Sequence, residues 1–328
     1  MVSIKNNKNS LFTRLLNYEY SVIGLLFLLI LIASPIVPNF LTIQNFSNIL
    51  TRSTVTAMAA IGMAFLMISG NFDLSVGGVV VLTAYIGVET LVIQMGVNIY
   101  LAALIMMGIG GIIGLVNGFS VVALGMPPFI ATLAMMNVTR GLAQYIYKTK
   151  TVFDLPKTWN IFGSGRLIGI PMPIIIFLIF FIVGHLILKY TLFGRCIYAV
   201  GSNKKAAWLA GVNTKKITYI AYIICGMTAG ATSVLLSSRL SSVVGTLGLG
   251  LELDVISAVV IGGASLMGGE GTIVGSFIGA IIIETVGNIL VLGRISAFLV
   301  LVAKGIVLWL AILIDMSRKG YVFRKLGE

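Results

Sequence analysis

Long hydrophobic stretches follow one another along this chain, separated by short polar connections. A helix needs roughly 20 mostly apolar residues to cross about 30 Å of hydrocarbon, and most of the stretches approach that length. The pattern has no strand-sized segments of alternating polarity, which favours a helical bundle over a barrel. We therefore predict an all-α integral membrane protein with about ten transmembrane helices. The predicted spans are 20–35, 48–69, 73–93, 99–124, 127–147, 172–190, 217–237, 251–268, 271–292 and 295–316.

Composition agrees with this pattern, since 58% of the 328 residues are apolar, only 10% are charged, and the mean hydropathy is +1.08. These values indicate one transmembrane domain, 20–316, flanked by segments 1–19 and 317–328. The first apolar run has no cleavage site closely after it, so we interpret it as a retained span rather than a signal peptide.

The formal net charge of +12 is explained by topology rather than by nucleic-acid binding. Thirteen of the 22 Lys and Arg residues lie near the N-terminus, near 189–216 and near the C-terminus. The positive-inside rule places these three regions in the cytoplasm, and the parity of ten spans agrees with it. Parity puts the basic segment 148–169 outside, against the rule, which makes it the weakest part of the predicted topology.

Glycines recur four residues apart within the spans, as in Gly110, Gly114 and Gly118, or Gly271, Gly275 and Gly279. Small residues at this spacing let membrane helices pack backbone to backbone. The stretches starting at Phe72 and Leu253 also resemble each other, and so do GLVNGFSVVA and GSFIGAIIIE. These weak similarities suggest a divergent internal repeat.

A polar island at 192–213 interrupts the hydrophobic pattern. Its GSNKKAAWLAGV motif predicts a short amphipathic helix that Ser202 or Asn203 caps and Gly211 ends. We interpret the island as a docking surface for another subunit; a solvated connector is the alternative.

Polar residues inside or at the edges of the apolar spans are costly to bury unless they are paired or hydrated, so they indicate either a polar pathway or hydrogen bonding between helices. For Asp73, Glu252 and Asp254, near span ends, capping is the alternative to substrate contact. The candidates for lining a pathway are Asn71, Asp73, Asn117, Glu252, Asp254, Glu284 and Asn288.

Catalytic and nucleotide-binding motifs do not occur in the sequence: GxxxxGK[ST], HExxH and GxSxG are all absent. The single histidine, His185, forms neither a metal site nor a proton relay by itself. The chain is therefore not predicted to be an enzyme, to bind a metal or to hold a cofactor. A membrane protein of this kind moves something while another subunit supplies the energy.

Four sequence blocks carry a resemblance to a known family over nearly the whole chain. They are NFSNILTRSTVTAMAAIGMAFLMISGNFDLSVGG from Asn45, PPFIATLAMMNVTRGLA from Pro127, GRCIYAVGSNKKAAWLAGVNTKKI from Gly194, and LELDVISAVVIGGASLMGGEGTIVGSFIGA from Leu251, together with GSGRLIGIPMP from Gly163. With them the chain resembles the ribose-type permeases of bacterial ABC importers for monosaccharides, which are inner-membrane proteins.

The resemblance implies a homodimer in membrane lipid, a cytoplasmic ATPase that uses ATP and Mg, and a binding protein that delivers sugar from outside. It also implies that the island, within 191–216, is the contact with the ATPase. The residues carried over to this coupling segment are Gly194, Arg195, Gly201, Asn203, Lys204, Lys205, Ala206, Ala207, Leu209 and Gly211.

The sequence departs from the family pattern at Asn71, Phe72, Leu251 and Glu270, which leaves the sugar open. Relatives of the family carry nucleosides, inositol or autoinducer-2. One rival hypothesis is an ion-coupled secondary transporter, in which protonation of Glu89 or Glu284, or ion binding to them, governs transport. The other is a non-transporting scaffold.

Overall fold

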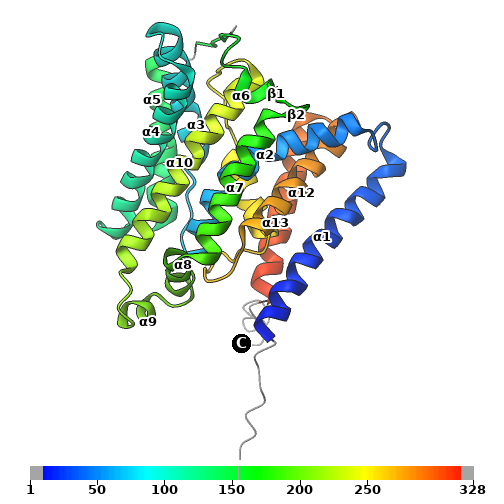
Figure 1. The fold of residues 1–328 in the computed structure, drawn as a ribbon. Helices are drawn as coiled ribbons and strands as arrows, with labels where there is room; N and C mark the ends of the chain where they lie inside the picture. Colours follow the sequence, from blue (N-terminus) through cyan, green and yellow to red (C-terminus); the bar gives the residue numbers. More distant parts are fainter. Residues whose placement is uncertain (1–9, 149, 154, 319–328) are drawn as a thin grey trace, which may run out of the picture.

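The computed structural model of the protein describes residues 10–148, 150–153 and 155–318, and these residues are mostly helical (Figure 1). The elements are α1 (Ser10–Ile36), α2 (Ile43–Ile68), α3 (Val76–Ala84), the π-helix η1 (Tyr85–Gln94), α4 (Ile99–Val122), α5 (Pro128–Tyr147), α6 (Ile161–Ser164), β1 (Arg166–Leu167), β2 (Ile170–Pro171), α7 (Met172–Tyr190), α8 (Leu192–Ser202), α9 (Lys204–Leu209), α10 (Thr214–Leu240), α11 (Leu251–Ile261), α12 (Ile273–Leu292) and α13 (Ala297–Arg318).

Six of the described helical stretches are both long and apolar enough to cross a membrane: α2, α3 with η1, α4, α7, α10 and α12. The apolar parts of α1 and α13 found in the described residues, Val22–Ile36 and Phe298–Leu313, are shorter. Helix α5 has 20 residues but carries Asn137 and Arg140, which lower its hydropathy. The all-helical membrane fold is thus confirmed. Helix also extends into the predicted flanking segments, because α1 begins at Ser10 and α13 ends at Arg318; residues 1–9 and 319–328 lie outside the described part of the chain.

The predicted span 251–268 is wrong in length. Helix α11 has 11 residues and ends at Ile261, and a glycine-rich loop follows up to Thr272. At 1.5 Å per residue its length is roughly 16 Å, about half of a bilayer core. Gly263, Gly268 and Gly269 all have positive φ, a conformation that glycine adopts at no steric cost and that ends the helix here.

Side chains at the helix starts explain where many helices begin. An Asn or Thr oxygen accepts a hydrogen bond from a backbone N–H two or three residues later, which satisfies one of the free donors of the first turn. The residues that cap helices in this way are Thr42, Asn98, Thr191, Asn203, Asn213 and Thr272. Prolines at the first turns of α5 and α7 act similarly, since they have no N–H to leave unsatisfied.

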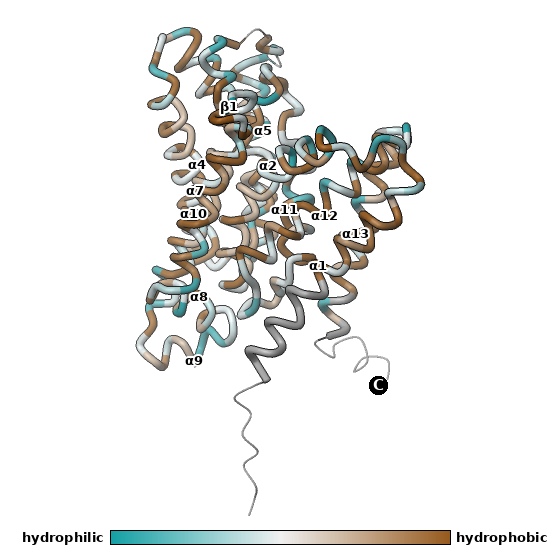
Figure 2. The backbone as a smooth tube through the Cα atoms, turned by 45° about the vertical axis from the view of Figure 1, so that its right-hand side comes forward, coloured by the Kyte–Doolittle hydropathy of each residue, from teal (hydrophilic) through white to brown (hydrophobic). Residues whose placement is uncertain are grey.

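Two ends of the bundle can be told apart (Figure 1). Helices α8 and α9, the beginning of α1 and the end of α13 lie at one end, whereas α6, β1 and β2 lie at the other. Figure 2 shows hydrophilic positions gathered at both ends and mostly hydrophobic ones along the helices between them. The arrangement agrees with the predicted parity, and the described part of the basic segment 148–169 lies at the end opposite α8 and α9.

Helices α4 and α10 cross at glycines, as their spacing predicts. A Cβ atom at Gly110 would meet the carbonyl of Gly226, and one at Gly114 would meet the carbonyl of Tyr222. The contacts run in opposite directions along the two helices, so α4 and α10 are antiparallel. Gly275 and Gly279 of α12 pack in the same close manner against α11.

The order of elements is similar in two parts of the chain. Helices α2, α3 and α4 follow one another with a break at 69–75, and helices α10, α11 and α12 follow one another with a break at 241–250. Helix α2 packs on α12 and helix α10 packs on α4, while α2 and α10 contact each other at the centre. The first helix of each part thus packs on the third helix of the other part, as expected if the two parts are repeats. The glycine motifs do not take equivalent places, because Gly114 contacts α10 whereas Gly275 contacts α11.

Candidate functional site: a coupling segment and a polar pathway

The coupling segment consists of two short helices, α8 and α9, where the sequence predicted one. Asn203 separates them, and its side chain accepts a hydrogen bond from Ala206 N at 2.9 Å, which confirms the predicted cap. Gly211 has φ +84° just after α9, as expected for a residue that ends a helix. Ala207 is buried. The exposed members of the predicted set are Arg195, Asn203, Lys204, Lys205, Ala206, Leu209 and Gly211.

Trp208 is an exposed aromatic residue that the predicted set left out. Its side chain is 65% exposed and that of Leu209 is 69% exposed, although both are large and apolar. Exposed apolar residues beside Lys204 and Lys205 form a surface suited to a protein partner rather than to bulk water. The signal in the sequence was a tryptophan next to Leu209 in a short segment that begins with two lysines.

Glycines attach α8 to the rest of the bundle. A Cβ atom at Gly194 would run into the backbone of Leu188, and one at Gly201 would run into the carbonyl of Ile68 at the end of α2. Gly269 N donates to that same carbonyl at 2.8 Å, and the Tyr198 hydroxyl donates to the carbonyl of Gly271 at 2.6 Å. The segment is thus fixed both to α2 and to the loop between α11 and α12.

The predicted pathway residues fall into separate groups, of which one surrounds Asp73 in the break between α2 and α3. Its carboxylate accepts hydrogen bonds from Ser75 N at 2.7 Å, from Ser75 Oγ at 2.6 Å and from Asn117 Nδ2 at 3.0 Å. Asp73 and Asn117 are both buried. The carboxylate is bonded to residues of its own chain, which favours the structural interpretation. Asn71 lies nearby and bonds to Ser69 instead.

A second group lies on α2 and α12. Asn288 and Asn45 exchange hydrogen bonds at 2.9 and 3.1 Å, and Glu284 accepts one from Thr56 at 2.8 Å. Because Glu284 and Asn288 are four residues apart, they share one face of α12. Both predicted residues are therefore brought to the interface between α2 and α12.

Asn288 also lines a polar cavity of about 470 Å³ at the end of the bundle opposite α8 and α9. The cavity wall includes Arg52, Arg166 and Arg239, and the charge of Arg239 interacts with those of Arg52 and Glu284. These arginines were not among the predicted pathway residues, because an arginine near the end of a span is equally typical of a topology signal. The full wall is Gln44, Asn45, Ser47, Asn48, Thr51, Arg52, Gly163, Ser164, Arg166, Pro171, Arg239, Asn288, Val291 and Leu292.

Glu252 and Asp254, the two acidic residues in the first turn of α11, have different surroundings. Asp254 forms an ion pair with Lys304 of α13 at 2.6 Å and interacts with the charge of Glu284. Glu252 faces the opposite way, toward Gly77 of α3 and Arg140 of α5. The side chains that neutralise Asp254 and Glu252 thus come from different helices.

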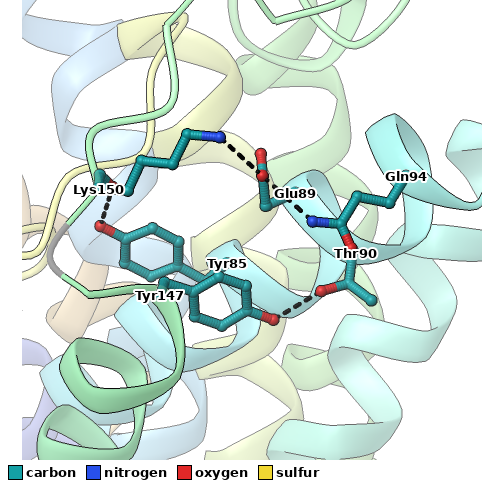
Figure 3. Close-up of polar contacts among 6 residues, drawn as sticks. All are labelled: Tyr85, Glu89, Thr90, Gln94, Tyr147 and Lys150. Atoms are coloured by element: carbon teal, nitrogen blue, oxygen red, sulfur yellow. Dashed lines mark hydrogen bonds and ion pairs between the residues drawn. The ribbon is translucent and has the colours of Figure 1, made fainter.

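The π-helix η1 carries a network at the end of the bundle opposite α8 and α9 (Figure 3). Its members are Tyr85, Glu89, Thr90, Gln94, Tyr147 and Lys150. A π-helix bonds each N–H to the carbonyl five residues back, so residues four and five apart share a face. Glu89 pairs with Lys150 at 3.1 Å, the Tyr85 hydroxyl donates to the Lys150 carbonyl at 2.7 Å, and the rings of Tyr85 and Tyr147 stack at 4.6 Å. Glu89 is thus part of a structural network that joins η1 to the end of α5.

The described residues contain no group of three His, Cys, Asp or Glu side chains that could hold a metal ion. The bundle of apolar helices, its internal polar groups and the exposed helices α8 and α9 at one end are features expected of a multi-pass membrane permease. Comparison with known proteins gives the family. Residues 45–314 match the family described as "Branched-chain amino acid transport system / permease component", and the chain belongs to this family.

Named relatives extend over most of the chain. The ribose import permease protein RbsC of Escherichia coli K12 is 39% identical over 306 residues, covering 92% of this chain and 94% of the relative. RbsC of Bacillus subtilis is 38% identical over 295 residues, covering 89% and 91%. The L-arabinose ABC transporter permease protein AraH of Azospirillum brasilense is 34% identical over 283 residues, covering 86% and 83%. No solved structure matches the chain significantly.

Proposed function

We propose that this chain is the permease subunit of an ATP-driven importer and forms the path for a monosaccharide such as ribose. The similarity to ribose and arabinose permeases over most of their lengths carries the proposal. The sugar arrives on a binding protein outside the cell. Two identical chains dimerise in the bacterial inner membrane, with both termini in the cytoplasm, and enclose the path between them.

The energy comes from a separate ATPase that docks on α8 and α9. The exposed Trp208 and Leu209 supply apolar contact area, and Lys204 and Lys205 supply positive charge. Closure of the ATPase on ATP and Mg displaces this segment. Its attachment to the end of α2 and to the α11–α12 loop then passes the movement into the bundle.

Copurification in mild detergent tests the ATPase partner. The tagged chain is expected to retain a P-loop ATPase, detected by mass spectrometry and by ATP hydrolysis. Reversing two charges with Lys204→Glu and Lys205→Glu is expected to release it. The matched control, Lys157→Glu with Arg166→Glu, reverses two exposed charges at the opposite end and should keep the ATPase bound. Retention by both double variants would refute docking on α9.

Uptake of radiolabelled D-ribose and L-arabinose into proteoliposomes tests the transport itself, with permease, ATPase and binding protein supplied together. Uptake should require ATP and continue in the presence of a protonophore. Uptake that a protonophore abolishes and that needs no ATP would instead support a secondary transporter. In that case Glu89→Gln and Glu284→Gln together should stop it.

A further inference from the structure

A buried hydrogen-bond donor and a buried acceptor converge on Gly77, in the first turn of α3. A Cβ atom at this position would run into Glu252 Oε2 and would lie 3.3 Å from Arg140 Nη2. Glu252 is only 8% exposed. Neither Glu252 Oε2 nor Arg140 Nη2 has a hydrogen-bond partner among the residues that the structure describes.

Glu252 has backbone hydrogen bonds at 250 and 252 and is attracted by Arg140, but its Oε2 has no hydrogen-bond partner among the described residues, which sets it apart from the other acidic residues inside the bundle. Asp73 accepts three hydrogen bonds, Asp254 is paired with Lys304, and Glu284 accepts from Thr56. Leaving a buried charged group unsatisfied costs several kcal/mol. Arg140 Nη2 and Glu252 Oε2 are therefore expected to be satisfied by a molecule that enters from outside the chain.

The chemistry of the two groups defines what that molecule must offer. A guanidinium only donates hydrogen bonds and a carboxylate only accepts them, so a single partner has to accept from Arg140 and donate to Glu252. A hydroxyl group does both. A solute with several neighbouring hydroxyl groups suits the pair better than an anion, which Glu252 repels, or a cation, which Arg140 repels.

The position of the pair also suits a transported solute. Helices α3 and α11 both follow a non-helical break, and Gly77 and Glu252 lie in their first turns. Interrupted helices inside a bundle are where membrane transporters commonly place substrate groups. The two atoms are buried, but Arg140 as a whole is only half-buried and Asn137, one turn before it on α5, is exposed, so polar side chains continue from the pair to the surface of α5.

We propose that Arg140 and Glu252 form a hydroxyl-binding site of the translocation path, where Arg140 Nη2 donates to and Glu252 Oε2 accepts from a hydroxyl group of the solute. The proposal deepens the proposed function and rests on it. Because the pair binds one hydroxyl group rather than a whole sugar ring, it can bind any solute that carries several hydroxyl groups.

The test is a saturation-transfer NMR titration of the full-length permease in lipid nanodiscs, with D-ribose, 2-deoxy-D-ribose and 5-deoxy-D-ribose as probes. The wild type should bind D-ribose and should bind one of the deoxy sugars more weakly. Arg140→Lys and Glu252→Gln should each raise the dissociation constant for D-ribose by at least about tenfold and remove the difference between the sugars. The isosteric Glu252→Gln change keeps the test valid where Arg140→Lys fails to fold.

The control is Glu89→Gln, which alters another buried glutamate but one that is paired with Lys150 at the end of the bundle. It should bind D-ribose as the wild type does. Unchanged affinity in Arg140→Lys and Glu252→Gln, with a lower melting temperature, would show a pair bridged by structural water and overturn the proposal. Absence of binding to any of the three sugars by the wild type would overturn it too, whereas ATP-driven uptake and ATPase copurification judge the proposed function separately.

Discussion

From the hydrogen bonds around Asp73 we predict how strongly each of three single substitutions lowers the free energy of unfolding. Asn117 donates from Nδ2 both to Asp73 Oδ2 at 3.0 Å and to Ser75 Oγ at 2.9 Å. Its own Oδ1 is buried without a partner among the described residues. The amide can therefore turn over and present an acceptor where it now presents a donor, and this freedom decides how each substitution behaves.

Asp73→Asn should be the mildest change, because the new amide can donate to Asn117 after Asn117 turns over. Its expected cost in free energy of unfolding is about 1 kcal/mol, that of one exchanged hydrogen bond. Asn117→Ala removes one charge-assisted and one neutral hydrogen bond and should cost roughly 2–4 kcal/mol. Asn117→Asp brings two buried carboxylates together and should be the most damaging, because neither can stay ionised without repelling the other.

Thermal unfolding of the purified permease in one detergent measures the order, with size-exclusion profiles as a check of folding. On the scale of globular domains, Asn117→Ala should lower the apparent melting temperature by roughly 5–15 °C. The double variant Asp73→Asn with Asn117→Asp exchanges the donor and the acceptor. It should therefore recover most of the stability that Asn117→Asp alone loses. An Asp73→Asn variant as unstable as Asn117→Asp, or a double variant without recovery, would refute this account.

Three further changes act elsewhere in the fold and use the same melting assay. Gly226→Leu should prevent α4 and α10 from packing backbone to backbone and lower the free energy of unfolding by roughly 3 kcal/mol. Gly108→Leu, on the open side of α4, should be tolerated. Equal effects of the two substitutions would contradict close packing of α4 on α10 at these glycines. Lys304→Met should cost roughly 1–3 kcal/mol by leaving Asp254 without its cation, and adding Asp254→Asn should recover part of that loss. Ile168→Gly should stabilise the turn between β1 and β2 by about 1 kcal/mol, because Ile168 is 94% exposed and held at φ +52°; a loss of stability would contradict this.

The helices could be predicted from the sequence because membrane spans are specified locally. Runs of apolar residues, capping side chains such as Asn203 and prolines such as Pro128 all act within a few positions of the place they determine. The glycines of α4 indicated close packing as well. Their partner helix, α10, carries its own glycines four apart, Gly226 and Gly230, but it lies more than a hundred residues later, and local spacing does not say which helices pair.

The features that were predicted wrongly or not at all share one physical cause, which is that the hydropathy of a segment does not record its backbone geometry in the fold. The run 251–268 is apolar throughout its centre, yet α11 stops at Ile261 because the glycines after it adopt positive φ. The π-helix η1 has the composition of an ordinary span. Arg140 and Glu252 are separated by 112 positions, so only the folded chain shows that they face the same glycine.

Under the proposed function, the attachment of α8 would let one docking surface act on both interrupted regions. Gly201 packs on the carbonyl of Ile68, the last residue before the break that leads to α3. The Tyr198 hydroxyl bonds to Gly271, in the loop that leaves α11. Gly269 N bonds to the same Ile68 carbonyl and joins the two regions directly. A displacement of α8 is therefore expected to move the end of α2 and the loop after α11 together. Because α2 leads through this break into α3, and α11 contacts α3 and carries Glu252, such a movement would change the surroundings of Gly77.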